Sequence, residues 1–278
     1  MRFSQRIGAR PLPKSGLEEA SPDLRTQLWN FLHRIAFPED ARSYTRSLWT
    51  AKQIWNHLDL RTDKVPTHVF EMREFLSKYW FSCDWPEFYD LVEFIADLKD
   101  PNYASTPGKL YEHLNYILEA QGAAYRFIAE ELAPLTNPVE VAEVTRAAES
   151  AIPAVASHIR EALTLLPPSP DASPRNSVKE SISAVEAALK HFSGDAGAAL
   201  KEGLSAFETK YGSLHPALKA GLVKLYGYTS DEKGIRHALV DEAADVTVDD
   251  ARFMLIVCSA FANYLVALSS ARDATGVS

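Results

Sequence analysis

Helix starts marked by proline constrain this chain more than any other feature of its sequence. Ser21-Pro22, Asp84-Trp85-Pro86 and Asn137-Pro138 each place a short polar side chain one or two residues before a proline. Such side chains accept hydrogen bonds from the free N–H groups of a first helical turn, where proline is also tolerated. Apolar residues follow each start at intervals of three and four, and no segment shows the alternation of a strand. The sequence therefore predicts an all-α fold.

The same periodicity predicts the remaining helices, at residues 43–58, 69–81, 196–210, 216–225 and 250–268. The helix after Asn137 is expected to present on one face Val141, Val144, Ala148 and Ile152. The clearest apolar stripe follows Pro174 and ends at a glycine stop: Val178, Ile182, Val185, Leu189, Phe192, Gly194. The last helix is apolar nearly all round, so we expect it at the centre of a helical bundle.

Two proline-rich breaks divide the chain. Residues 133–138 form a turn between an N-terminal helical domain, 1–136, and a C-terminal bundle, 137–278. Residues 166–174 hold several prolines, which remove backbone donors and restrict the residues before them. We expect this second segment to be a loop between two antiparallel helices of the bundle.

Composition excludes several classes of protein. Apolar residues make up 46% of the chain, enough for a core that needs neither metal nor disulfides. Cys83 and Cys258 lie in different halves without zinc-ligand spacing, so a reducing compartment, the cytoplasm, is expected. The net charge of −8 argues against a domain dedicated to nucleic acid and requires that any RNA contact be local.

Little in the sequence supports a membrane span, a metal site or a cofactor site. The apolar run 253–268 is shorter than the roughly 18–20 residues of a membrane span, and we interpret it as a core helix. The chain has no phosphate-binding glycine loop, no His-Glu-x-x-His helix and no nucleophile elbow. Neither a metal nor a cofactor is therefore expected.

A first polar cluster opens the helix that follows Ser173. Arg175 and Lys179 are four residues apart and share one helical face, while Asn176 and Glu180 form the neighbouring row. The free N–H groups of a helix start attract phosphate, so Arg175 and Lys179 are candidates to hold a backbone phosphate. The alternative is a solvated first turn with an Arg–Glu pair.

A second cluster, residues 226–239, lies in a segment expected to connect two helices. It combines two glycines and two tyrosines with the pair Arg236-His237. A neutral imidazole at His237 can act as acid or base near neutral pH, with Arg236 stabilising charge in a transition state. The alternative is a histidine that holds the loop through a hydrogen bond to a carbonyl.

These clusters resemble one protein family. The segments PRNSVKESISAVE (174–186), GYTSD (227–231), GIRHAL (234–239) and CSAFANYL (258–265) are similar to the C-terminal HEPN-like region of AbiJ-type abortive-infection proteins of bacteria. The first residues, MRFSQRIG (1–8), resemble the N-terminal domain that accompanies that region. The resemblance spans nearly the whole chain and implies a role in anti-phage defence.

The resemblance also implies an activity. HEPN domains are helical bundles, and many are metal-independent RNA endonucleases that act as dimers. With this resemblance, the candidate catalytic residues are Arg175, Asn176, Arg236 and His237, and the candidates to bind RNA are Lys179, Glu180 and Tyr228. The family motif is an arginine, often followed by a polar Asn or Asp, and then a histidine four to six residues further on. After Arg175-Asn176 this chain departs from the motif and holds Glu180, Ser181 and Ile182 at those positions.

Three interpretations stay open at this point. In the first, the chain is an RNA endonuclease effector in which His237 supplies the imidazole. In the second, the bundle is a non-catalytic sensor or interaction module of a defence system. In the third, it is the toxin of a toxin–antitoxin pair. A homodimer is expected under all three, with RNA, a partner protein or a phage trigger as further partners.

Overall fold

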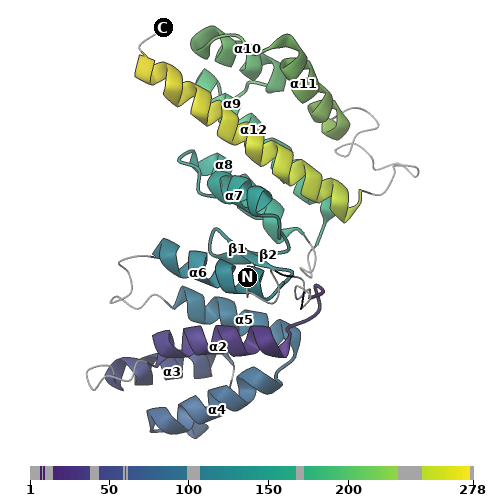
Figure 1. Ribbon diagram of the computed structural model, residues 1–278. Coiled ribbons are helices and arrows are strands. Elements are labelled where there is room, and N and C mark those ends of the chain that lie inside the picture. The colour runs from purple at the N-terminus through teal and green to yellow at the C-terminus, as the bar shows by residue number, and fades with distance from the viewer. Residues whose placement is uncertain are drawn as a thin grey trace. The chain divides into compact units, whose positions relative to one another are not determined.

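The computed structural model describes residues 7, 9, 15–37, 44–58, 60, 62–98, 107–166, 172–230 and 246–275. These residues are almost wholly helical, which confirms the all-α fold (Figure 1). The chain divides into two compact units, residues 1–136 and 137–278, which are described separately below.

The first unit is built from helices and one short hairpin. Its elements are α2 (Pro22–Ala36), α3 (Tyr44–His57), the 3-10 turn η1 (Thr62–Lys64), α4 (Val69–Ser82), α5 (Trp85–Asp97), α6 (Pro107–Ala120), β1 (Arg126–Ile128) and β2 (Glu131–Ala133). The predicted caps are present. Ser21 Oγ accepts from Leu24 N at 3.2 Å, and the Asp84 carboxylate accepts from Glu87 N at 3.1 Å.

A buried arginine joins three helices at the centre of the first unit. Arg25 of α2 is 9% exposed and donates to the backbone oxygens of Trp80 at 2.6 Å and Cys83 at 2.9 Å. Its Nε also donates to Ala20 O, and its guanidinium lies 4.5 Å from the ring centroid of Phe88 on α5. Because backbone carbonyls accept its hydrogen bonds and an aromatic ring faces it, the guanidinium keeps interaction partners although it is buried.

The hairpin, like α6 and the 3-10 turn η1, was not predicted from sequence patterns. β1 and β2 pair antiparallel through a turn in which Ala129 and Glu130 have φ values of 50° and 78°. Two positive φ values define a turn type that usually carries Asn-Gly, so Ala-Glu gives no signal for it. On the open side of β1, the Asn115 amide bonds both N and O of Phe127, at 2.7 and 2.9 Å.

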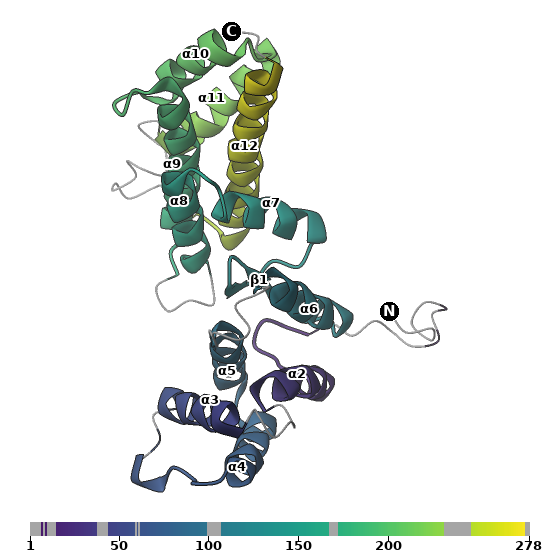
Figure 2. The same cartoon turned by 90° about the vertical axis from the view of Figure 1, so that its left-hand side faces the viewer.

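The second unit is a bundle organised around two long helices. Its elements are α7 (Pro138–Ala148), α8 (Pro153–Thr164), α9 (Pro174–Ser193), α10 (Leu200–Tyr211), α11 (Pro216–Ser230) and α12 (Val248–Thr275). α9 packs against α8, α10 and α12, and α12 also packs against α7 (Figures 1 and 2). The predicted stop is present, since Gly194 ends α9 in the left-handed conformation with φ 73°.

Two predicted helix boundaries in this unit were wrong. α7 ends at Ala148, so Ile152 does not share its face but caps α8, which begins at Pro153. α11 continues to Ser230, so Tyr226, Gly227 and Tyr228 belong to a helix rather than to a connection. A single glycine does not stop a helix that packs on one side against its neighbours.

The last helix is longer and less enclosed than its sequence predicts. α12 runs from Val248 to Thr275, and Phe253 and Tyr264 on its outer face are 55% and 38% exposed. Among the described residues, α12 is long and apolar enough to cross a membrane by length and composition. Half of its most apolar stretch is buried within the structure.

Candidate functional site

The polar cluster at the start of α9 lies beside α8. Ser177 Oγ donates to Ala162 O at 2.8 Å, and Ser173 N donates to Leu165 O at 2.9 Å across the connection. Successive contacts therefore run forward along α9 and backward along α8, and the two helices are antiparallel as predicted. Ser177 is completely buried, and its small side chain lets the helices approach closely.

A histidine from α8 meets this cluster. His158 Nδ1 lies 2.7 Å from Glu180 Oε2 of α9. The side chains are 38% and 28% exposed, so the pair is accessible to solvent at the edge of the α8–α9 contact. This hydrogen bond occupies Nδ1 of the His158 imidazole. Nε2 makes no hydrogen bond with the residues that the structure describes.

The predicted residues of α9 occupy two neighbouring rows. Arg175 and Lys179 are both partly buried, and Asn176 is exposed. Asn176 lies one turn before Glu180 on the same row, and Arg175 and Lys179 form the next row. Two turns of one helix thus hold both cations and the amide, and His158 of α8 contacts Glu180 within the same two turns.

The second predicted cluster falls largely outside the described residues. Arg236 and His237 both lie outside the described residues. Tyr228 lies on α11 and is 45% exposed. Burial of its ring, with a smaller contribution from Asp250, raises the pKa of its hydroxyl.

The last segment of the family resemblance, residues 258–265, joins α12 to the rest of the bundle. Asn263 of α12 is buried, and its amide donates to the backbone oxygen and the carboxylate of Glu143 on α7, each at 2.9 Å. Cys258 is buried, and loss of solvent raises the pKa of its thiol to about 12. We therefore interpret both residues as structural.

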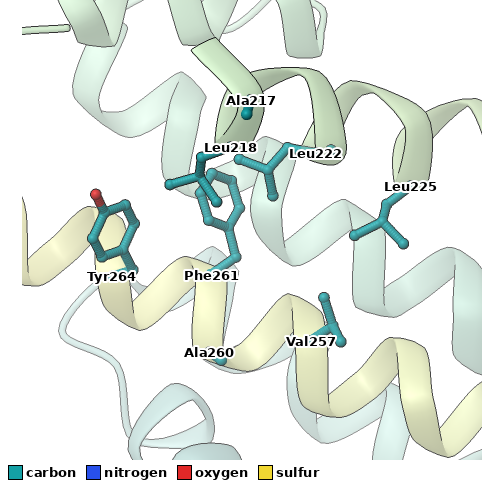
Figure 3. Close-up of a pocket in the computed structure, with 9 residues that line it drawn as sticks. Ala217, Leu218, Leu222, Leu225, Val257, Ala260, Phe261 and Tyr264 are labelled. Carbon is teal, nitrogen blue, oxygen red and sulfur yellow. The ribbon is translucent and has the colours of Figure 1, made fainter. Parts of the chain in front are cut away.

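An apolar groove of the second unit lies elsewhere, between α11 and α12. It has a volume of about 650 Å³ and is lined by Ala217, Leu218, Gly221, Leu222, Leu225, Val257, Ala260, Phe261 and Tyr264. Figure 3 shows the leucines of α11 facing Val257 and Phe261 of α12. A phosphate or nucleotide needs charged or convergent polar groups, and this lining offers none beyond one tyrosine hydroxyl. The groove is suited to apolar side chains rather than to RNA.

The described residues contain no group of three or more His, Cys, Asp or Glu side chains placed to hold a metal ion. Among the residues that the structure describes, the polar side chains that match the sequence prediction are those at the start of α9.

Comparison with known proteins identifies one family. The family model described as AbiJ N-terminal domain 4 matches residues 1–150, which is more than half of the chain. The match covers the first unit and continues through α7. No curated protein and no solved structure matches significantly.

Proposed function

The chain belongs to the AbiJ N-terminal domain 4 family, and we propose that it is a cytoplasmic abortive-infection effector of anti-phage defence whose second unit is a HEPN-like RNA endonuclease. The family membership supports the defence role. The nuclease assignment rests on the sequence resemblance of residues 174–186 and on the chemistry that α9 presents.

One observation carries the nuclease proposal: Arg175, Asn176 and Lys179 lie within the first two turns of α9, and Glu180 of the same turns contacts the imidazole of His158. Two cations on one row can bind a phosphate, and the helix start adds its free N–H groups. Cations fixed beside a phosphate also stabilise the charge that develops on it during cleavage. The resemblance supplies the reaction, which is metal-independent attack of a ribose 2′-hydroxyl on the neighbouring phosphate.

Replacement of Arg175 by alanine tests this proposal. The full chain, supplied with labelled single-stranded RNA and EDTA, is expected to produce fragments that end in 2′,3′-cyclic phosphate. Arg175→Ala is expected to lower the cleavage rate by about 10²- to 10³-fold, because a fixed charge at the phosphate is lost. The control is Lys201→Ala, which removes an exposed cation of α10 and should leave the rate unchanged.

Either of two results would overturn the nuclease assignment. One is full cleavage by Arg175→Ala protein. The other is the absence of RNA cleavage by wild type, both as purified protein and in phage-infected cells. Toxicity on expression alone, relieved by the product of a neighbouring gene, would instead identify the toxin of a toxin–antitoxin pair.

A second candidate function, protein interaction, is favoured by the groove between α11 and α12. Large exposed apolar side chains of the described second unit gather on these two helices, Val139 of α7 excepted: Leu218, Tyr228, Val248, Phe253 and Tyr264. The groove lining carries no charge, so two copies can meet there around a two-fold axis without like-charge repulsion. We place the contact of the proposed homodimer on this face.

Replacement of Leu218 by lysine is expected to dissociate the proposed homodimer into monomers. Light scattering should show wild type as a dimer and Leu218→Lys as a monomer at the same concentration, because the contact would then bury an unpaired charge. Val139→Lys places the same charge on α7, where the wild-type side chain is 72% exposed, and should remain a dimer. A monomeric wild type at high concentration would contradict the proposed contact.

A further inference from the structure

We propose that His158 of α8 supplies the imidazole for RNA cleavage and that Glu180 of α9 positions it. The proposal rests on the proposed nuclease function and identifies the base that α9 lacks. In the sequence, Glu180 stands where a histidine is expected after Arg175. In the structure, that carboxylate lies 2.7 Å from His158 Nδ1.

The register of the two helices creates the pair. Ser177 Oγ is bonded to Ala162 O, which fixes α9 against α8 at that point. Glu180 lies three residues after Ser177, and His158 lies four residues before Ala162, so one turn along the antiparallel contact brings them together. On α8, the neighbouring Val155 and Ile159 are completely buried and anchor the helix below His158.

The arrangement is better suited to catalysis than to stability. Ion pairs that stay partly in water contribute little to folding, and both of these side chains are more than a quarter exposed. A carboxylate that accepts the Nδ1 proton of an imidazole selects the tautomer in which Nε2 carries the free electron pair. The same carboxylate stabilises the imidazolium that forms when Nε2 takes up a proton.

The reaction needs no co-reactant beyond water. His158 Nε2 removes the proton of a ribose 2′-hydroxyl, and the 2′-oxygen forms a bond to the adjacent phosphorus. The bond from phosphorus to the 5′-oxygen breaks, and its electron pair stays on that oxygen, which takes a proton from water. The resulting hydroxide accepts the proton of the imidazolium and restores the base. The products are a 2′,3′-cyclic phosphate end and a 5′-hydroxyl end, and DNA, which lacks the 2′-hydroxyl, is not a substrate.

His158→Ala is the direct test. The cleavage rate is expected to fall at least 100-fold, the usual contribution of a general base, whereas RNA binding measured by fluorescence anisotropy should change less than twofold. Imidazole added to the buffer should restore part of the rate of His158→Ala and none of the rate of Arg175→Ala. The control is His191→Ala, an exposed histidine later on α9, which should cleave as wild type does.

The role of Glu180 is tested separately, because it is a positioning residue. Glu180→Gln is expected to lower kcat by about 10-fold or more without changing KM, since the amide keeps a polar contact but no longer favours the basic Nε2 tautomer. Glu180→Asp should recover part of the loss. A rise in KM with unchanged kcat would instead show that Glu180 contributes to RNA binding alone.

The outcomes separate this inference from the function on which it rests. If wild type cleaves RNA and Arg175→Ala does not, but His158→Ala retains full activity, the proposed function stands and the role of His158 is wrong. Loss of cleavage in His237→Ala but not in His158→Ala would assign the base to the second cluster. A wild-type protein that never cleaves RNA overturns both proposals.

Discussion

Replacing Arg25 with methionine is expected to lower the free energy of unfolding of the first unit by about 3 to 5 kcal/mol. The guanidinium donates to the backbone oxygens of Trp80, Cys83 and Ala20 and lies over the Phe88 ring. Methionine fills a similar volume but donates no hydrogen bond, so several carbonyls between α2, α4 and α5 lose their partner. A buried acceptor without a donor costs about 1–3 kcal/mol.

Tryptophan fluorescence during urea unfolding measures this loss in the first unit alone. All five tryptophans of the chain lie between residues 29 and 85. The matched control is Arg34→Met on the same helix, where the side chain is exposed, and its effect should stay within about 0.5 kcal/mol. If Arg25→Met cost less than about 1 kcal/mol, the carbonyls would have found other donors and the described network would not be a stability determinant.

Replacing Glu93 with glutamine is expected to stabilise the first unit by about 2 kcal/mol at pH 8 and to have little effect near pH 4.5. The pKa of the Glu93 carboxyl is raised from 4.5 to about 7, mainly by burial and to a smaller extent by the nearby Glu131 and Asp90, while the N–H that Leu132 donates lowers it. Between pH 4.5, the ordinary pKa of the carboxyl, and about pH 7, its pKa in the folded chain, the folded chain holds a proton that the unfolded chain releases. Stability therefore falls as pH rises from about 4.5 to 7 and stays low above that window. Glutamine still accepts from Leu132 but carries no charge to desolvate.

The measurement is urea unfolding at pH 5 and at pH 8, again followed by tryptophan fluorescence. Glu74→Gln is the control, because Glu74 is exposed and Lys78 holds the pKa of its carboxyl below the ordinary value. Glu74→Gln should bring no gain at pH 8. An equal effect of Glu93→Gln at both pH values would show that the carboxyl of Glu93 is ionised throughout this range.

Local signals in the sequence predicted most of the helices. The caps at Ser21, Asp84 and Asn137 act within four residues of chain, so α2, α5 and α7 start where the sequence places them. The hairpin was missed because Ala129 and Glu130 adopt positive φ values without the usual turn residues. Surrounding contacts, including those of Asn115 with β1, hold that conformation, and a local pattern does not carry such information.

In the candidate site, as in the fold, local sequence predicted one part, and the other part depends on tertiary contacts. The rows of Arg175 with Lys179 and Asn176 with Glu180 follow from helical periodicity, and the structure has both on α9. His158 escaped prediction because its contact with Glu180 depends on how α8 lies against α9. One signal was present: His158 directly precedes Ile159 at the edge of the buried stripe of α8, the position from which a polar side chain reaches a neighbouring helix.

Because His158 and Glu180 lie on two different helices, the proposed chemistry requires that these helices be packed together. A motif contained in one helix is complete as soon as that helix forms. A base on α8 and its partner on α9 meet only when the two helices pack, and both helices also pack against α12, which follows them in the sequence. A nascent or partly unfolded chain would therefore be harmless to the RNA of its own cell, which is a useful property in a protein whose proposed action halts its host.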